Sequence, residues 1–316
     1  MKRILTLLLA LALLATPALA GDDDAEGLYT ELTAEQTAAE EEAAAAILEQ
    51  ILLPDMTDGE KALVIHDWLV LNTVYSLDKY RDMDYGAVVR HEAICRGYAR
   101  GFVYLAERAG LESVYTFSPE LIHAWALTKL DGSFYCADPT WDDNHYERIG
   151  FVNHRHFLFS TEAGRALNHY GEDTALIADG GEYEAAPWRE AVTQVIFLGG
   201  YMYFINRDFE LIRCDRGTWD CTVLLRCLGH WEGFREDYDE SLEAISTGLV
   251  LRDGRLWFNT PHAVFSILPD GSDLHCEYEN DGAAGYLCGL AEQDGRLVVS
   301  VSAVCKTRDY ELLEIG

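Results

Sequence analysis

The sequence predicts an α+β protein in which helices come first, a β-hairpin follows, and an all-β repeat domain with propeller-blade-like meanders ends the chain. Three observations predict it. Apolar residues recur at helical spacing after Cys95. Two short apolar runs meet at Asp131 and Gly132, the dipeptide favoured by a two-residue type I′ turn. From Val195 onward, three related phrases each pair a glycine turn with short alternating strands.

The first twenty residues have the pattern of a signal peptide. Lys2 and Arg3 precede an apolar stretch from Ile4, and small residues lead up to Ala20, after which we expect cleavage. We expect no lipid anchor because no cysteine stands at the cleavage site directly after the apolar stretch. No later run reaches the ~18 apolar residues that a membrane span requires. The mature chain is therefore expected to be secreted, outside the cytoplasm and without a membrane anchor.

Residues 21–53 form an acidic segment rich in alanine and glutamate. A helix is expected to begin after Thr33, with Gln36 as its capping-box partner, and to run to about Leu53, where Pro54 ends it. The stretch from residue 21 to residue 60 holds 13 acidic residues and no basic one. A solvated helix face explains this run better than a dedicated cation site.

The net charge excludes some classes of partner. The whole chain carries -30, and removal of Lys2 and Arg3 takes the mature form to -30 - 2 = -32. Such a field repels nucleic acid and anionic membrane surfaces, so we expect neither as a partner.

A second capping box, Thr57 with Glu60, introduces a helix whose apolar residues include Leu63 and Trp68. Residues 72–94 then form a longer, polar connection. Segments of this kind often line a cleft.

Cys95 lies in the first turn of the next predicted helix. The apolar residues after it recur at helical spacing, and Gly110 supplies a C-terminal stop. At a helix N-terminus, the unsatisfied backbone N–H groups and the positive end of the dipole stabilise a thiolate. The same N–H groups can hold the oxyanion of an acyl intermediate. Arg96 adds a neighbouring cation.

The predicted hairpin brings His123 and Asp138 together. A two-residue turn makes Leu130 face Ser133, and strand parity then places His123 and Asp138 on one face as diagonal neighbours, about 7–8 Å apart at the backbone. A slip of one residue would separate them. With Cys95 they supply the side chains of a catalytic triad: a thiol nucleophile, its base, and the carboxylate that orients the base.

Each of the three residues also has a structural interpretation. A cysteine on a helix stripe is usually a small hydrophobic residue, a strand histidine is often half-buried, and an aspartate before proline often starts a turn. Their occurrence in order, with the helix start and the hairpin parity both satisfied, favours the catalytic interpretation.

The segments AICRGYARGF, HAWALTKLDGSFYCADPTWDD and TDGEKALVIHDWLVLNTVYS resemble the transglutaminase-like superfamily of papain-like cysteine enzymes, in its bacterial secreted branch. The resemblance extends over residues 53–170. It implies a cysteine-bearing helix packed on an antiparallel sheet and a catalytic domain over residues 54–175. It also implies Cys95 as the nucleophile, His123 as the general base and acid, and Asp138 as the residue that fixes the imidazole tautomer.

The chain departs from the family pattern at two places. Ala93 and Ile94 stand where Gly-Val is usual, and Cys136 stands where an aliphatic residue is common. Neither departure touches the triad. Because family members often use an additional aromatic or amide donor in the oxyanion hole, Tyr75 is a candidate for that role.

Residues 176–192 are expected to form a linker, and residues 193–316 the β-repeat domain. Its three units are fewer than the about four blades of an ordinary closed propeller, so an incomplete or atypical repeat is expected. Its strand aromatics, such as Tyr201, Tyr203 and Trp257, are expected to pack in the core rather than to contact a ligand.

The chain has eight cysteines. With Cys95 free, an odd number remains, and Cys136 is expected to be a packed thiol. The others have room for up to three disulfides, and their spacing leaves the pairing open: Cys214, Cys221, Cys227, Cys276, Cys288 and Cys305. No zinc-type CxxC pair occurs, and the histidines at 154 and 156 are too small a set for a metal site. We therefore expect no metal and no cofactor.

Three functions fit these features. The first is a secreted cysteine peptidase or amidase that acts on a protein or peptide, including one of the cell wall. The second is a protein-crosslinking transglutaminase, in which a lysine amine replaces water in the last step. The third is a non-catalytic module that binds the cell surface or wall. Hydrolysis is preferred because the resemblance is to exported relatives expected mostly to hydrolyse. The sequence leaves the oligomeric state open.

Overall fold

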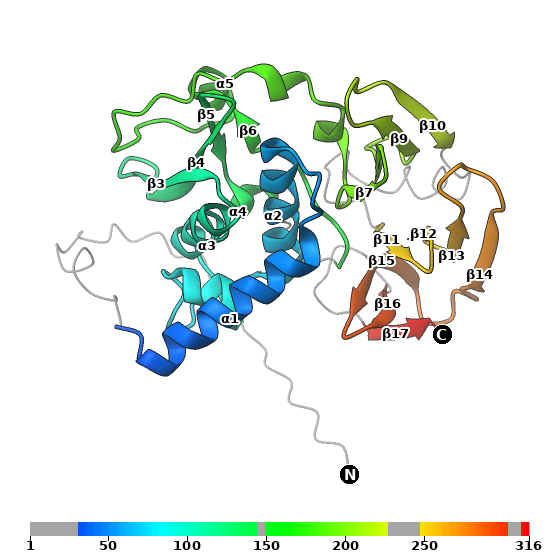
Figure 1. The fold of residues 1–316 in the computed structure, drawn as a ribbon. Helices are drawn as coiled ribbons and strands as arrows, with labels where there is room; N and C mark the ends of the chain where they lie inside the picture. The colour runs from blue at the N-terminus through cyan, green and yellow to red at the C-terminus, as the bar shows by residue number, and fades with distance from the viewer. Residues whose placement is uncertain (1–30, 144–148, 227–246, 303–310, 316) are drawn as a thin grey trace, which may run out of the picture. The chain divides into compact units, whose positions relative to one another are not determined.

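The computed structural model describes residues 31–143, 149–226, 247–302 and 311–315 (Figure 1). The predicted signal peptide lies outside these ranges. Among the described residues, no helix has both the length and the apolar character needed to cross a membrane.

Two capped helices open the described chain. Helix α1 (Ala34–Ile51) follows Thr33, which forms the predicted capping box with Gln36. Helix α2 (Asp58–Asn72) follows Thr57, whose capping-box partner is Glu60. Both predicted starts are confirmed, because each N-cap hydroxyl accepts from the backbone N–H three residues later.

The polar connection after α2 leads the chain back to the start of the cysteine helix. Strand β1 (Val74–Tyr75) pairs in parallel with β2 (Glu92–Ala93), and a π-helical turn, η1 (Gly86–Arg90), lies between them. Gly97 is required here because an added Cβ would lie 2.3 Å from the backbone oxygen of Arg81. The connection therefore contacts the cysteine helix closely.

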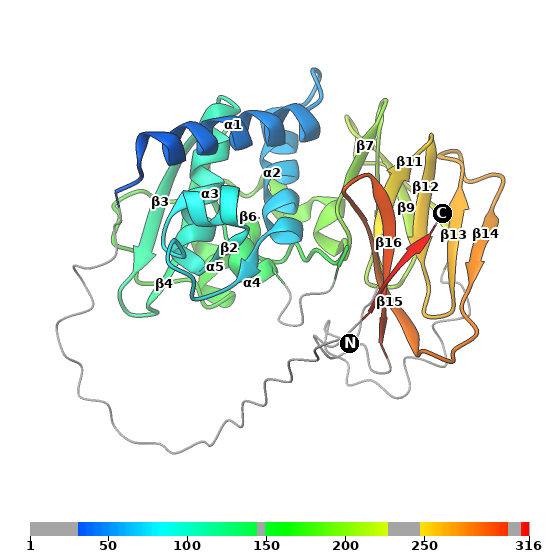
Figure 2. The same cartoon turned by 90° about the horizontal axis from the view of Figure 1, so that it is seen from below.

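The cysteine helix packs on an antiparallel sheet. Helix α3 (Cys95–Arg108) contacts β3 (Glu112–Ser118) and β4 (His123–Leu130), and β5 (Ser133–Ala137) and β6 (Phe157–Phe159) complete the sheet in the order β3-β4-β5-β6. Figures 1 and 2 show α3 beside this sheet. A cysteine-bearing helix packed on an antiparallel sheet is the arrangement that we expected for this part of the chain.

The predicted hairpin has the predicted register. Leu130 pairs with Ser133 and Ala126 pairs with Ala137. Asp131 and Gly132 have φ values of 50° and 93°, as a type I′ turn requires. The turn therefore places His123 and Asp138 at the same end of the sheet.

Two short α-helices and two 3₁₀ turns follow the hairpin. They are α4 (Pro139–Asp142), α5 (Thr161–Ala166), η2 (Glu182–Ala185) and η3 (Pro187–Glu190). Within the expected linker 176–192, Tyr183, Trp188 and Ala191 are buried in the same core as the side chains of α2 and α3. This core continues into Val195 and Phe204. The segment is therefore packed rather than extended.

The C-terminal part forms three antiparallel meanders, each built from consecutive strands (Figure 1). The first contains β7 (Ile196–Leu198), β8 (Tyr201–Ile205), β9 (Leu211–Asp215) and β10 (Cys221–Leu225). The second contains β11 (Leu249–Arg252), β12 (Arg255–Asn259), β13 (Ala263–Ile267) and β14 (His275–Glu279). The third contains β15 (Tyr286–Gln293), β16 (Arg296–Ser302) and β17 (Glu311–Ile315). Within the described ranges these sheets form no closed barrel or propeller.

The described cysteines include both disulfide-bonded residues and free thiols. Cys214 and Cys221 form a disulfide between the paired strands β9 and β10. Cys276 is free and exposed, so the six C-terminal cysteines do not form three bridges. Cys136 is free and buried, which confirms the packed thiol. Cys227 and Cys305 lie outside the described residues.

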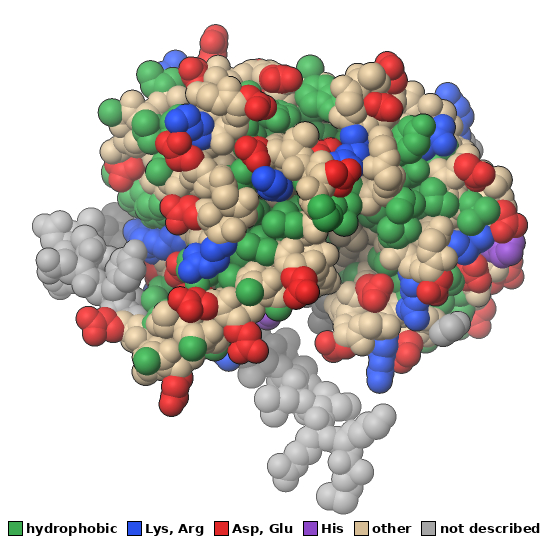
Figure 3. Space-filling view, viewed as in Figure 1, with side chains coloured by type: hydrophobic (Ala, Val, Ile, Leu, Met, Phe, Trp, Pro, Cys, Tyr) green, Lys and Arg blue, Asp and Glu red, His purple; other side chains and the backbone are tan. Residues whose placement is uncertain are grey.

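The strand aromatics differ in exposure. Tyr203 is buried as expected, Tyr201 is exposed, and Trp257 is partly buried. On the face drawn in Figure 3, acidic and basic side chains are interspersed rather than separated into patches.

Candidate active site

Cys95 is the first residue of α3 and a free, buried thiol with 7% of its surface exposed. The N-cap residue, Ile94, makes no side-chain hydrogen bond to the first turn. An isoleucine side chain offers no acceptor, so it leaves the first backbone N–H groups of the helix to other partners. The sulfur thus lies at the positive end of a helix whose N-terminus has no side-chain cap.

His123 and Asp138 form a buried hydrogen bond. Nε2 of His123 lies 2.6 Å from Oδ2 of Asp138. Asp138 is also the N-cap of α4, and its Oδ1 accepts from the backbone N–H groups of Thr140 (3.1 Å) and Trp141 (3.3 Å). The backbone therefore fixes one carboxylate oxygen, and the other oxygen faces the imidazole. Because Nε2 is engaged, Nδ1 is the ring nitrogen left to exchange a proton with a thiol.

The charges of the site couple all three predicted residues. Burial opposes a charge on His123, but the charge and hydrogen bond of Asp138, followed by a hydrogen bond and charge from Cys95, raise the pKa of His123 to about 10. Burial likewise opposes a charge on Asp138, but His123 and then His169 bring the pKa of this carboxyl below its ordinary value. The pKa of His123 therefore depends on both Asp138 and Cys95.

Trp141 covers the imidazole. Its ring stacks on the ring of His123 with centroids 4.5 Å apart and an interplanar angle of 15°. This contact restricts rotation of the imidazole and shields the His123–Asp138 hydrogen bond from water. Sequence reasoning missed this role, although Trp141 lies only three residues after Asp138.

Tyr75 lies at the end of β1, opposite Ala93 and 48% exposed. Burial and then the charge of Cys95 raise the pKa of Tyr75, so the phenol is within electrostatic range of the sulfur. Its contribution to an oxyanion hole remains a prediction.

His169 also reaches the site, and sequence reasoning missed it. Its Nε2 lies 2.9 Å from Oδ2 of Asp138, the oxygen that His123 also contacts. His169 follows α5 in a segment with no periodic pattern, so the sequence carries no signal for this contact.

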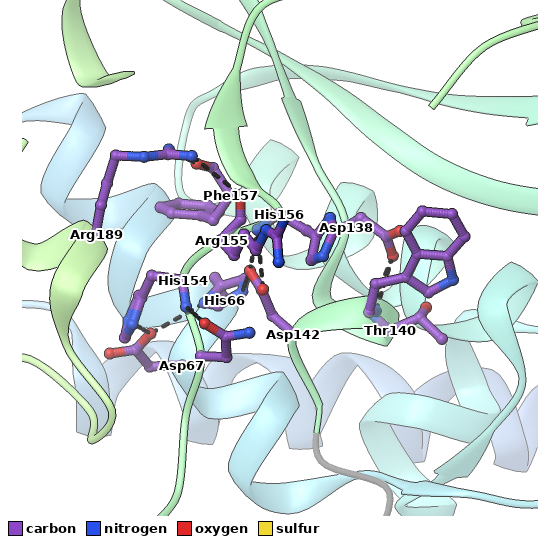
Figure 4. Close-up of polar contacts among 12 residues, drawn as sticks. His66, Asp67, Asp138, Thr140, Asp142, His154, Arg155, His156, Phe157 and Arg189 are labelled. Atoms are coloured by element: carbon purple, nitrogen blue, oxygen red, sulfur yellow. Dashed lines mark hydrogen bonds and ion pairs between the residues drawn. The ribbon is translucent and has the colours of Figure 1, made fainter. Parts of the chain in front are cut away.

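Figure 4 shows Asp138 together with a second buried polar network, which contains His66, Asp67, Asp142 and His154. His66 on α2 places Nδ1 3.0 Å from Oδ1 of Asp67 and Nε2 3.1 Å from Oδ2 of Asp142. Nε2 of His154 lies 2.8 Å from the same Asp67 oxygen, and Oδ2 of Asp67 accepts from the backbone N–H of Val195 at 2.8 Å. Asp142 ends α4, so this network supports the short helix that Asp138 caps.

Two groups in the described residues have the composition of a metal site: His66, Asp67 and His154, and His123, Asp138 and His169. In a tetrahedral zinc site, bonds of about 2.0–2.1 Å separate neighbouring ligand atoms by about 3.3 Å. Here the contacts between the nitrogens and the shared oxygens are 2.6–3.0 Å. These separations are those of hydrogen bonds and are shorter than the separations expected between two ligands of one metal ion.

The free energy of unfolding is expected to fall as the pH rises from 6.5 to about 9. Burial opposes a charge on His66, but hydrogen bonds to Asp142 and Asp67 raise its pKa from 6.5 to about 9. A group whose pKa is raised on folding stabilises the protein fully below its unfolded pKa and loses that effect through its folded pKa. His123 adds a similar loss that extends further into the alkaline range.

Thermal unfolding across this pH window tests the expectation. The His66→Gln variant should be less stable at neutral pH and should lose less stability between pH 6.5 and about 9. An equal slope in wild type and variant would show that His66 is not charged in the folded protein.

No protein-family model and no curated protein matches the chain. Among solved structures, a transglutaminase is 17% identical with a TM-score of 0.33, over 41% of this chain and 39% of its own. A putative cysteine protease from Cytophaga hutchinsonii is 14% identical with a TM-score of 0.28, over 35% of this chain and 43% of its own. The matched region thus spans about two fifths of each of these proteins.

An arylamine N-acetyltransferase from Salmonella typhimurium is 12% identical with a TM-score of 0.27, over 76% of this chain and 84% of its own. All three scores are low. The candidate site is accordingly defined by the His123–Asp138 hydrogen bond and by the position of Cys95 at the start of α3.

Proposed function

We propose that the protein is a cysteine-dependent amide hydrolase, a peptidase or amidase, that acts outside the cytoplasm through a thioester acyl-enzyme. One observation carries the proposal: Nε2 of the buried His123 imidazole is hydrogen-bonded, at 2.6 Å, to a carboxylate that the backbone also fixes, and Cys95 helps to raise the pKa of this imidazole. This is the arrangement that nucleophilic catalysis requires, with a base at the nucleophile and a third group orienting the base.

The acylation step follows from this geometry. The thiolate of Cys95 attacks the carbonyl carbon, and the C=O electron pair moves onto oxygen. The backbone N–H groups of the first α3 turn stabilise this oxyanion, with the Tyr75 hydroxyl as a candidate second donor. Nδ1 of the His123 imidazolium then gives its proton to the leaving nitrogen. The C–N bond breaks, and a thioester and a free amine result.

Deacylation returns the site to its starting state. Neutral His123 takes a proton from water at Nδ1, and the hydroxide attacks the thioester carbon. The C–S bond breaks, the carboxylic acid leaves, and the thiolate and imidazolium are restored. Throughout, Asp138 accepts the Nε2 hydrogen and thereby keeps Nδ1 as the nitrogen that exchanges protons.

Thiol labelling tests the proposal without a known substrate. Cys95 is buried and Cys276 is exposed. Limiting iodoacetamide should nevertheless alkylate Cys95 first. Alkylation requires a thiolate, and the proposed mechanism has a Cys95 thiolate beside the His123 imidazolium. Slight desolvation, followed by the charge of Glu279, raises the pKa of Cys276, and burial raises the pKa of Cys136 to about 12, so both serve as internal controls in the same peptide map.

His123→Ala should slow the labelling of Cys95 to the rate of Cys276 or below, and Cys95→Ala should abolish it. If wild-type Cys95 reacts no faster than Cys276, the thiol is not activated and a binding module is the better interpretation. Hydrolysis and acyl transfer are then separated by incubation with a glutamine-containing protein and a labelled primary amine. Stable incorporation of the amine would replace hydrolysis by crosslinking.

A further inference from the structure

His169 lies where a fourth member of the catalytic group would lie. Its side chain is 1% exposed, and Nε2 contacts the same Oδ2 atom of Asp138 that accepts from His123. Its other ring nitrogen, Nδ1, lies 3.2 Å from the backbone oxygen of Leu167. Both ring nitrogens of His169 therefore face oxygen atoms.

The identity of these partners constrains the protons of His169. A backbone carbonyl only accepts, so Nδ1 must carry a hydrogen to bond to Leu167. An ionised carboxylate also only accepts, so Nε2 must carry one to bond to Asp138. A neutral imidazole has a single N–H and can satisfy one of these oxygens. His169 can form both hydrogen bonds at once only as an imidazolium, with a hydrogen on each ring nitrogen.

Aromatic side chains surround the imidazole of His169, so a water molecule has little room to replace it as a donor to Asp138. The ring lies edge-on to Trp125 and Trp141, with centroids 5.0 Å and 4.4 Å away, and 4.8 Å from the ring of Phe159. Among the residues that the structure describes, the titratable groups that face it are Asp138, His123, whose ring centroid is 6.0 Å away, and His156, at 5.3 Å. Aromatic walls thus exclude water from the shared oxygen.

We infer that His169 is a positioning residue for the proposed reaction: it fixes Asp138 by a second hydrogen bond and limits the basicity of His123 with a nearby positive charge. His169 acts through Asp138 and makes no contact with the reacting atoms. Both effects act on proton transfer by His123. This imidazole must hold its proton while the thiolate attacks, and it must then release the proton to the leaving amine. Since the inference concerns that reaction, it rests on the proposed function.

The alkaline limb of Cys95 alkylation tests the inference. Iodoacetate is an anion and reacts best with a thiolate beside an imidazolium, so its rate falls when His123 loses its proton. His169→Gln can still donate an amide hydrogen to Asp138 but removes the positive charge. This change increases the basicity of His123, so the limb should move to higher pH by about one unit, which is a tenfold change in the protonation equilibrium.

His156→Gln is the matched control. His156 is part of the same aromatic cluster, but its Nδ1 has no hydrogen-bond partner within the described part of the chain. This variant should keep the wild-type limb to within a few tenths of a unit. If the alkaline limb of the His169→Gln variant lies at the wild-type pH or lower, His169 does not act on His123 and its role is only to pack. If wild-type Cys95 shows no fast, pH-dependent reaction at all, the proposed function itself fails, which is a distinguishable result.

Nitrogen NMR of the wild-type protein gives a second measurement that needs no variant. The ring nitrogens of His169, assigned through contacts to Trp125 and Phe159, should both be protonated at neutral pH. One unprotonated ring nitrogen at neutral pH would overturn the inference.

Discussion

Replacing Asp138 by alanine is expected to lower turnover by about 10⁴-fold, the scale of losing the orienting acid in comparable triads. The carboxylate accepts from the imidazoles of His123 and His169 and from the N–H groups of Thr140 and Trp141. Without it, the imidazole of His123 loses the contact that keeps Nδ1 available for proton transfer.

Asp138→Asn should have intermediate activity. An amide has one oxygen and one NH₂ group, so it can accept from the two backbone N–H groups or from the two imidazoles, but not from both sets. The matched control is Asp131→Asn in the hairpin turn, because asparagine also suits the φ of 50° at this position.

Turnover is measured on a peptide that the wild-type protein cleaves, with circular dichroism to verify folding. The order wild type, Asp138→Asn, Asp138→Ala is expected, and Asp131→Asn should match wild type. Wild-type turnover in a folded Asp138→Ala protein would remove Asp138 from the mechanism.

The positions of Cys95, His123 and Asp138 were predictable because each follows from a local rule. Helical spacing after Cys95 fixed the helix start, and the turn at Asp131 and Gly132 fixed the register that joins His123 to Asp138. Turn type and side-chain alternation act over a few residues, so a single sequence is sufficient to read them.

The residues around the triad were not predictable because they reach it from irregular segments. His169 follows α5, and His154 lies in the segment before β6. Their partners, Asp138 and Asp67, lie 31 and 87 residues away along the chain. No periodicity links such pairs, and their contacts arise only when the helices and the sheet pack.

The expected linker shows the same limit. An acidic, glycine-containing composition indicates a loop, but Tyr183 and Trp188 pack their rings at 6.3 Å inside the core that also contains Phe204. Composition reports the exposed positions of such a segment, whereas a few large aromatic residues determine how it packs.

Helix α4 connects the two buried networks. Asp138, at its N-cap, is hydrogen-bonded to the imidazole of His123, and Asp142, at its last position, accepts from His66 and from the backbone N–H of His156. The four-residue helix is too short to be stable by itself. The network at its far end therefore holds the Asp138 carboxylate in place indirectly.

Asp67→Asn is expected to lower the free energy of unfolding by about 3–5 kcal/mol, the cost of breaking a buried ion pair by removing one partner. Asp67 is 3% exposed and accepts from His66, His154 and the backbone N–H of Val195. An asparagine must turn its NH₂ group toward at least one of these donors, and the protonated His66 then loses one of its two carboxylate partners. Asp58→Asn on the same helix is the control, because its exposed pair with Lys61 contributes only about 0–1 kcal/mol. Urea unfolding with an unchanged m value measures both variants. A loss for Asp67→Asn no greater than that of the control would show that the buried network does not stabilise the fold.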